Sequence, residues 1–446
     1  MDSEPSQALY DDLLDWLRIP SVSTGAEVDA DAMLAAAQWV CDRVVAAGGT
    51  AAPDTTYGGN PLAVGELPAS REGAPTILIY GHYDVQAPGD PADWTSPPFE
   101  PEVREGRLFG RGTADDKGNF LPLLHVACEL ARAGDLPVNV RVLVEGEEEV
   151  GGEAVAAWIE AQGVPADCAI VFDSGPADAR TPAITVGLRG CVMIQLEVKT
   201  AEGHLHSGSY GGTVLNSLHV LHAMLSEVVP GPDGHLSEEL RAGIAAPSAA
   251  ELASWEELTP GGDVIAQAGG KPVSPDAGAR FYERTGADAS LDINEISGGE
   301  PRTVIPGSAR ATLSMRLAPG QSAREMSETL QRLLRDAAPD GAEVTMEVEA
   351  FEPALCDPGS EAVRLAAAAL TRAAGGVECA LIREGGSIPI VAGMLATGMP
   401  TIVSGFSVPE DHIHAPDESY LVSSLAWGER SARELYAALA SLEPAG

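Results

Sequence analysis

The sequence is poor in basic residues for its length. Its 446 residues include 66 Asp and Glu but only 27 Lys and Arg, and lysine occurs only at positions 117, 199 and 271. The formal net charge of −39 at pH 7 repels phosphate backbones and anionic lipid. We therefore expect neither nucleic acid nor membrane among the partners of this protein. Most of the acidic side chains are expected on a solvated surface.

Long apolar runs, a leader segment and closely spaced cysteines are also missing. No stretch approaches the ~18 apolar residues of a membrane span. Residues 1–4 lack the basic start and the apolar run of a signal peptide, so we expect a cytoplasmic protein. The six cysteines are scattered without a CxxC spacing. This spacing argues against a structural zinc module or a disulfide framework and predicts small buried side chains.

The first third of the chain predicts an α/β architecture. Continuous apolar runs at 76–80, 138–144 and 168–172 are typical of strands that are buried on both faces. Helical periodicity at 31–47 and at 119–133 alternates with these runs. Strands that alternate with helices predict a mostly parallel sheet with helices on both faces.

The pattern changes near residue 187 and predicts a second domain. The expected elements are, in order, a strand at 191–199, a helix at 213–229, strands at 291–296 and 309–317, a helix at 322–338 and a strand at 343–351. This βαββαβ order is that of a small open-faced sandwich, interrupted by a long insert at about 231–288. We therefore expect residues 1–186 and 353–446 to form one α/β domain, with residues 187–352 inserted as the second.

Metal-binding residue types follow each strand of the predicted parallel sheet. His82 and Asp84 follow the first, an acidic run at 145–149 follows the second, and Asp173 follows the third. The carboxyl ends of parallel strands meet at one edge of a sheet, so these side chains are expected close together. Imidazoles and carboxylates from distant parts of a chain are the ligands of zinc-like cations. One histidine in a polar turn is by itself more often structural, but three such strand ends favour a metal site.

The residues within these turns divide into ligands and supporting groups. His82 is the natural ligand, and Asp84, two residues later, is a carboxylate that fixes its tautomer. Glu148 and Glu149 are adjacent, so one can bind a cation while the other takes a proton from metal-bound water. An acidic run of this kind is otherwise a solvated turn, and its place directly after an apolar strand favours the functional interpretation.

Other segments also carry candidate ligands. The glycine-rich segment 110–118 is a weak match to a phosphate-binding loop, and its paired aspartates at 115 and 116 better suit a carboxylate that bridges two cations. Two further segments, 204–208 and 411–418, each contain two histidines. One histidine of each pair is a candidate for function.

Taken in order, these segments resemble one known family. They are 82–86, 94–101, 110–118, 148–149, 173, 206–208, 303–306, 384–389 and 414–418. Together they resemble the co-catalytic dinuclear zinc metallopeptidases, which include carnosinase, bacterial dipeptidases, aminoacylase and succinyl-diaminopimelate desuccinylase. The resemblance covers nearly the whole chain. The Thr-Val-Ile-Pro segment at 303–306 and the Glu-Gly-Gly-Ser-Ile-Pro segment at 384–389 look most like the carnosinase branch.

The resemblance implies a role for each matching residue. One divalent cation would be held by His82 and Asp173, a second by Glu149 and His414, and Asp115 would bridge both. The cations would be zinc first, with manganese or cobalt as alternatives. His414 is preferred to His412 because the family places this ligand four residues before a Glu, here Glu418. The family also has a cis peptide bond after the bridging aspartate.

The remaining roles concern catalysis and substrate binding. The resemblance implies that Asp84 orients His82 and that Glu148 is the general base acting on a metal-bridging water. Glu147 departs from the family pattern, which has an apolar or small residue at that place. In the inserted domain, His206 would stabilise the developing oxyanion.

The inserted domain is also implicated in substrate binding and assembly. Arg316 would hold the substrate carboxylate, because a guanidinium suits bidentate capture. Ser387 would contribute to the substrate site together with His206 and Arg316. The inserted domain would act as a lid and mediate a homodimer.

The function expected from the resemblance is hydrolysis of the amide bond of dipeptides. A deacylase of N-acyl-amino acids or a glutamate carboxypeptidase-type hydrolase is the alternative within the enzyme class. A metal-free peptide-binding scaffold is the alternative from another class, and stoichiometric metal analysis separates it from the enzymes.

Overall fold

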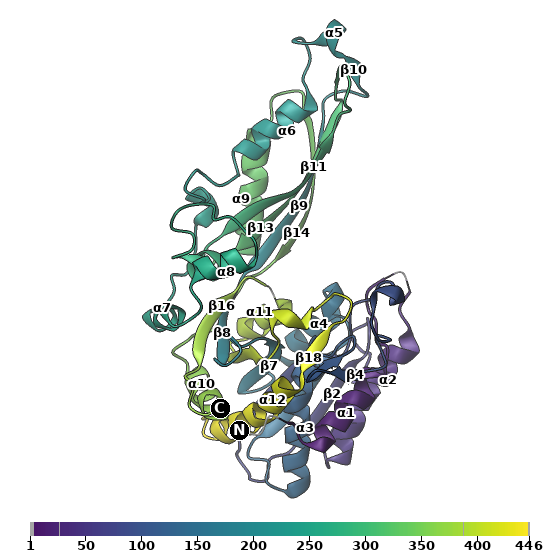
Figure 1. Ribbon diagram of the computed structural model, residues 1–446, viewed down its shortest axis with the longest axis vertical. Helices are drawn as coiled ribbons and strands as arrows, with labels where there is room; N and C mark the ends of the chain where they lie inside the picture. Colours follow the sequence, from purple (N-terminus) through teal and green to yellow (C-terminus); the bar gives the residue numbers. More distant parts are fainter. Residues whose placement is uncertain (1–3, 26, 387, 445–446) are drawn as a thin grey trace. The chain divides into compact units, whose positions relative to one another are not determined.

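Apolar runs from the first third of the chain form the centre of a six-stranded sheet (Figure 1). In the computed structural model, which describes residues 4–25, 27–386 and 388–444, the strand order is β1-β2-β6-β3-β7-β17. The neighbours β6, β3, β7 and β17 pair in parallel, whereas β1 and β2 are antiparallel. The bounds are β1 Thr50–Asp54, β2 Leu62–Leu67, β3 Thr76–His82, β6 Asn139–Glu145, β7 Cys168–Ser174 and β17 Thr401–Gly405.

Helices cover this sheet, and the predicted α/β class with a mostly parallel sheet is confirmed. α2 packs on β1 and β2, α3 on β3 and β7, and α10 on β17. Their apolar stripes join the sheet in one core because each helix buries the side facing the strands. The bounds are α1 Gln7–Leu17, α2 Ala30–Ala46, α3 Lys117–Ala133, α4 Glu153–Gln162, α10 Glu361–Ala373, α11 Pro389–Ala396 and α12 Val422–Leu439.

The chain divides into two compact units. The first contains residues 1–186, 356–382 and 393–446, and the second contains residues 187–355 and 383–392. Short strands form two further sheets, in the orders β18-β5-β4 and β15-β8-β16. Their bounds are β4 Glu102–Arg104, β5 Arg107–Phe109, β8 Ala183–Leu188, β15 Ala354–Leu355, β16 Ala380–Glu384 and β18 Ser419–Leu421.

The second unit contains a four-stranded antiparallel sheet in the order β11-β13-β9-β14. Alternate side chains of β9 and β13 are buried against α6 and α9, which accounts for the period-2 pattern of these strands. In chain order the elements run β9, α6, β11, β13, α9, β14, which is the expected βαββαβ order. The bounds are β9 Gly190–Lys199, α6 Ser217–Ser226, β11 Ser290–Gly298, β13 Ser308–Leu317, α9 Ala323–Asp336 and β14 Glu343–Phe351.

The insert at 231–288 is more ordered than its Pro- and Gly-rich composition indicates. It contains a 3-10 helix at Glu239–Arg241, two short α-helices and a π-helical turn. Elsewhere in the second unit, two short strands that are about a hundred residues apart in the chain pair with each other beside a one-turn helix. The bounds are α7 Ala249–Glu256, α8 Gly261–Gln267, the π-helix Glu283–Ala287, β10 Leu205–His206, β12 Val304–Ile305 and α5 Ser207–Tyr210.

The sequence predicted buried, unpaired cysteines and no membrane-spanning helix. All six cysteines are buried and free, as their scattered spacing predicts. Within residues 4–25, 27–386 and 388–444, none of the helices combines the length and the apolar character needed to cross a bilayer.

Candidate metal centre

The carboxyl ends of three adjacent strands bring the candidate ligands to one edge of the sheet. β3 ends at His82, and its neighbour β6 ends at Glu145, directly opposite His82 in the strand register. Asp173 is the penultimate residue of β7, on the other side of β3. Because these strands are parallel, their carboxyl ends meet as the sequence pattern predicts.

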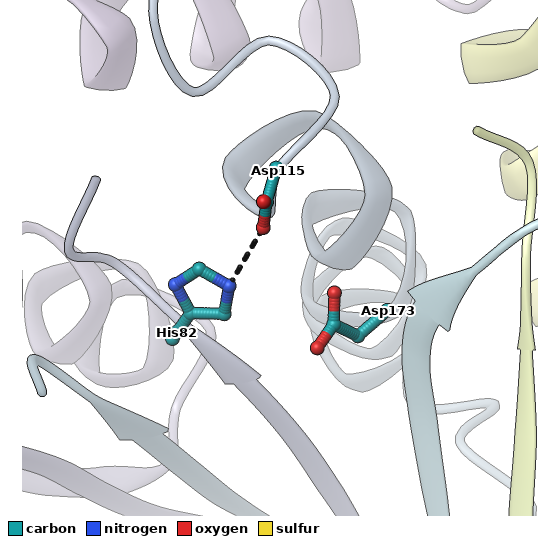
Figure 2. A group of neighbouring side chains, drawn as sticks. All are labelled: His82, Asp115 and Asp173. Atoms are coloured by element: carbon teal, nitrogen blue, oxygen red, sulfur yellow. Dashed lines mark hydrogen bonds and ion pairs between the residues drawn. The ribbon is translucent and has the colours of Figure 1, made fainter. Parts of the chain in front are cut away.

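One group of possible metal ligands consists of His82, Asp115 and Asp173. Their ligand atoms all lie within 4.8 Å of one another. The Nε2 atom of His82 lies 3.0 Å from Oδ1 of Asp115. Figure 2 shows the imidazole at the end of its strand, with the two carboxylates beside it on different elements. Asp115 precedes α3, and the peptide bond between Asp115 and Asp116 is cis.

A second group consists of Asp115, Glu149 and His414, with ligand atoms again within 4.8 Å of one another. The Nε2 atom of His414 lies 2.9 Å from Oδ2 of Asp115 and 3.0 Å from Oε2 of Glu149. Asp115 therefore belongs to both groups and presents a different oxygen to each histidine. A carboxylate that faces both groups in this way could bridge two cations bound side by side.

The electrostatics of the two groups favour positive charge between the carboxylates. Burial lowers the pKa of His82, but hydrogen bonds with Asp115 and Asp84 outweigh it and raise that pKa well above its ordinary value. Hydrogen bonds with Asp115 and Glu149 raise the pKa of His414 to about 10. Burial, reinforced by neighbouring carboxylates, raises the pKa of Asp173 well above its ordinary value. Divalent cations would supply this positive charge when bound, and their binding would release the imidazole protons.

Asp84 supports His82 and the acidic turn at the same time. The Nδ1 atom of His82 lies 3.0 Å from the backbone oxygen of Asp84 and 3.3 Å from its Oδ1 atom. The Asp84 carboxylate also accepts the backbone N–H groups of Glu148 and Glu149, each at 3.2 Å. The hydroxyl of Ser23 donates to its Oδ2 atom at 2.6 Å. Asp84 thus couples the orientation of the imidazole to the position of the two glutamates.

Glu418 links the two loops that carry Asp115 and His414. It is 1% exposed, and its carboxylate accepts a hydrogen bond from Nη1 of Arg111 at 2.6 Å. It also accepts the backbone N–H groups of Gly112 at 3.1 Å, Ala114 at 3.0 Å and Asp115 at 3.3 Å. The sequence interpretation used Glu418 only to choose between histidines, because its partners lie about three hundred residues away along the chain.

Replacing Glu418 with Gln should weaken cation binding by roughly 10–100-fold, as is usual when a group that supports metal ligands is lost. The amide cannot accept all four donors, so the Asp115 loop loses its anchor to the His414 loop. Cation affinity is measured by titration of chelator-treated protein. Asp417→Asn is the matched control, since Asp417 accepts instead from Thr95. Equal affinity in the Glu418→Gln and wild-type proteins would refute this role.

The structure places the other predicted residues as follows. His206 ends β10 and is exposed, and Arg316 lies in β13, so both belong to the second unit. Ser387 lies outside the described residues. His412 is exposed, and His204 lies 3.6 Å from Glu300. Gln86 was missed by the sequence interpretation, although its Nε2 atom donates to Glu149 at 2.9 Å.

A third group of possible ligands, His125, Glu129 and Glu429, lies on α3 and α12. Each of its three side chains already has a hydrogen-bond or ion-pair partner elsewhere in the protein. Glu129 lies 2.8 Å from Nη2 of Arg433, and Nδ1 of His125 lies 3.2 Å from Asp12. Glu429 accepts the backbone N–H of Ser6 at 2.8 Å. We interpret this group as an ion-pair network between helices.

Known proteins resemble this chain over most of its length. A Cysteinylglycine-S-conjugate dipeptidase from Corynebacterium striatum is 29% identical over 366 residues, which cover 78% of this chain and 77% of that protein. A Beta-Ala-His dipeptidase from Homo sapiens is 29% identical over 335 residues, covering 71% of this chain and 65% of that protein.

A solved structure and a family model agree with these relatives. The M20 family metallo-carboxypeptidase Sso-CP2 from Sulfolobus solfataricus superposes with a TM-score of 0.85 at 23% identity. The superposition covers 99% of this chain and all of that one, and it shows a common fold. The family model described as Peptidase family M20/M25/M40 matches residues 78–438. The match includes every residue of the two ligand groups, and the chain therefore belongs to peptidase family M20/M25/M40.

Proposed function

We propose that this protein is a dinuclear metallopeptidase that hydrolyses the amide bond of dipeptides. The observation that carries the proposal is the pair of ligand groups that share Asp115. His82 and Asp173 would hold one cation, and Glu149 and His414 would hold the other. Two imidazoles and three carboxylates fit zinc and similar divalent cations. Such cations polarise a carbonyl group and can lower the pKa of a water ligand from ~15.7 to ~7.

Glu148 is the proposed general base. Its backbone N–H donates to Asp84 at 3.2 Å, and its carboxyl group is close enough to His82 and Asp115 to interact with their charges. Burial, with smaller contributions from Asp115 and Glu149, raises its pKa to about 7. A carboxylate with this pKa accepts a proton from the attacking water and returns it to the leaving amine near neutral pH.

Residues of the second unit complete the proposed reaction. His206 stabilises the developing oxyanion, and Arg316 holds the substrate carboxylate with Ser387 as a further contact. His206 is exposed, and its imidazole, which lies 3.4 Å from the hydroxyl of Ser209 through Nδ1, could reach a ligand or a partner subunit. We propose that the unit containing these residues mediates a homodimer and acts as a lid.

Replacing His206 with Ala should lower kcat by roughly 10²–10³, which is the usual effect of losing one oxyanion donor. Cation content should not change, because His206 is not a member of either ligand group. Steady-state kinetics and metal analysis of the same preparation test both statements. His204→Ala, two residues away, is the matched control and should retain turnover. Loss of metal from the His206→Ala protein would contradict the assigned role.

Dipeptides are proposed as substrates because two relatives in this family are named as dipeptidases. N-acyl-amino acids and glutamyl peptides are the alternative substrate classes. Chelator-treated protein, reloaded with zinc, manganese or cobalt, is assayed against panels of all three classes. Preferred hydrolysis of dipeptides supports the proposal. Preferred hydrolysis of an N-acyl-amino acid or a glutamyl peptide would instead identify the protein as a deacylase or a glutamate carboxypeptidase-type hydrolase. A folded protein that takes up no cation would instead be a scaffold.

We further propose zinc as the cation and the cytoplasm as the location. Zinc is supported by the nitrogen and oxygen donor set, and reloading with each of the three metals tests it. The cytoplasmic assignment is supported by the six cysteines, which are all buried and free, since free thiols are typical of a reducing compartment.

A further inference from the structure

The side chain of Asn119, in the first turn of α3, is buried among backbone segments that it bonds to. It is 1% exposed. Its Nδ2 atom donates to the backbone oxygen of Ser174 at 3.1 Å and to the hydroxyl of Ser407 at 3.3 Å. Its Oδ1 atom accepts the backbone N–H of Phe406 at 3.0 Å and, at the longer distance of 3.4 Å, the hydroxyl of Tyr420. An amide has two donor hydrogens and two acceptor lone pairs, so the hydrogen-bonding capacity of this side chain is filled.

The partners of this amide lie near proposed metal ligands in the chain. Ser174 directly follows Asp173 at the end of β7. Ser407 lies two residues after the end of β17, in the segment that leads to His414. The amide of Asn119 therefore joins a strand that carries one ligand to a segment that carries another.

Ser407 extends this connection to the bridging aspartate. Its hydroxyl donates to the backbone oxygen of Ala114 at 3.3 Å, and Ala114 directly precedes Asp115. The backbone N–H of Ser407 also donates to the oxygen of Ser174 at 3.3 Å. Two side chains, those of Asn119 and Ser407, thus link three separate backbone segments, each of which carries a proposed ligand.

The ends of β7 and β17 approach each other closely at this place. Gly405 pairs with Ser174 in the strand register, and a Cβ atom on Gly405 would lie 2.0 Å from the backbone oxygen of Ser174. A Cβ atom on Gly175 would lie 2.2 Å from the backbone oxygen of Ser407. The two glycines therefore allow a contact that side chains would prevent. A buried polar network with all its bonds made fixes one arrangement of the segments that it joins.

We infer that Asn119 is a positioning residue of the metal centre, which fixes the separation of Asp173 from the segment that carries His414. Asp173 belongs to one ligand group and His414 to the other, whereas Asn119 belongs to neither. A metal site needs its ligands held within about 0.5 Å of the binding geometry by groups behind them. The amide therefore acts on both proposed cation sites through the backbone. The inference rests on the proposed metallopeptidase function.

Replacing Asn119 with Ala should weaken the binding of both cations by roughly 10–100-fold, the usual loss when a group that supports metal ligands is removed. Chelator-treated protein is titrated with cobalt in competition with a chromophoric chelator. Unfolding of the metal-free protein by urea is measured in parallel, because the loss of a buried amide also lowers stability.

Asn139→Ala is the matched control. Asn139 is the first residue of β6, at the end of the sheet opposite the proposed ligands. Its amide likewise bridges two backbone groups, since it accepts the N–H of Ala69 at 2.9 Å and donates to the oxygen of Ala74 at 2.8 Å. Both substitutions should destabilise the metal-free protein, but only Asn119→Ala should lower the affinity for cobalt.

Ser407→Ala is a milder variant, which serves if the Asn119→Ala protein does not fold. It removes one hydroxyl from the linked segments and should weaken cobalt binding by roughly 2–10-fold, the value of one hydrogen bond. Ser404→Ala is its control, because the hydroxyl of Ser404 on β17 donates to the backbone oxygen of Ala183 at 2.7 Å, on a strand without a proposed ligand. The Ser404→Ala protein should bind cobalt as the wild type does.

The outcomes separate this inference from the proposed function, because no substrate is used. Wild-type affinity for cobalt in the Asn119→Ala protein, or in the Ser407→Ala protein if the former does not fold, would overturn the inference alone. An equal loss of affinity in the Asn139→Ala protein would overturn it too, since any destabilisation would then weaken the site. Cobalt binding that depends on Asn119 in a protein without peptidase activity would support the inference and refute the function. A wild-type protein that takes up no cation would refute both.

Discussion

Replacing Glu148 with Gln should lower kcat for dipeptide hydrolysis by roughly 10²–10⁴, the usual contribution of general acid–base catalysis. Glutamine has the size of glutamate but cannot accept the proton of the attacking water. The five proposed ligands are untouched, so the protein should still bind two cations. Steady-state kinetics gives the loss of turnover, and elemental analysis of the same sample gives the metal content.

Glu147→Gln is the matched control for this experiment. Glu147 is the adjacent acid, and its carboxylate accepts the backbone N–H of Asn60 at 3.0 Å. It belongs to neither ligand group, so its replacement should leave kcat within a few-fold of wild type. A large loss in the Glu147→Gln protein with near-full turnover in the Glu148→Gln protein would move the general base by one residue.

Replacing Asp115 with Asn should remove the bridge between the two cation sites. Even a group that only supports metal ligands is worth ~10–100-fold in metal affinity or activity, and Asp115 is itself a proposed ligand at both sites. We therefore expect a combined loss of roughly 10²–10⁴ in kcat/KM and fewer than two bound cations per chain. Asp115 contacts both histidines in the structure, at 3.0 Å and 2.9 Å, so the change affects both ligand groups at once.

Asp116→Asn provides a closely matched comparison. Burial and the charge of Asp173 raise the pKa of Asp116 well above its ordinary value, and an amide has nearly the same shape as this carboxyl group. Its Oδ2 atom accepts the backbone N–H of His82 at 3.2 Å, and an amide oxygen can do the same. Retention of two tightly bound cations by the Asp115→Asn protein would exclude a bridging role.

Much of the metal centre could be predicted from local sequence. His82, Asp84 and Asp173 follow or end apolar strands, and parallel strands place such residues at one edge by geometry alone. The acidic run at 145–149 was predicted as one turn. In the structure, Glu145 is instead the last residue of β6, and Glu148 and Glu149 lie in a 3-10 helix after it. Glu145 is 2% exposed and lies beside the hydroxyl of Tyr80, and burial raises its pKa to about 8. A solvated turn would not show this difference, because it depends on how β6 packs.

Long-range contacts explain what sequence patterns did not reveal. Glu418 and Arg111 are separated by 307 residues, and no periodicity connects them. Lys117 was expected just before a helix that begins near residue 119, whereas α3 begins at Lys117 itself. Its side chain is fully buried, and its Nζ atom donates to the backbone oxygens of Trp16 at 3.2 Å and Ile19 at 2.9 Å. A lysine at a helix start is usually solvated. Only the packing of α1 against α3 therefore reveals that Lys117 is buried and binds the backbone at the end of α1.

The amino-acid sequence alone determined the order of strands and helices, the inserted βαββαβ arrangement and the residue types able to bind cations. These follow from periodicity and from the chemistry of each side chain, which are local properties. Only the tertiary structure decided that one carboxylate, Asp115, faces both His82 and His414, and that Glu418 links the loops that carry Asp115 and His414. Distances between residues remote in the chain depend on the packing of whole elements, and that packing is a cooperative property of the folded protein.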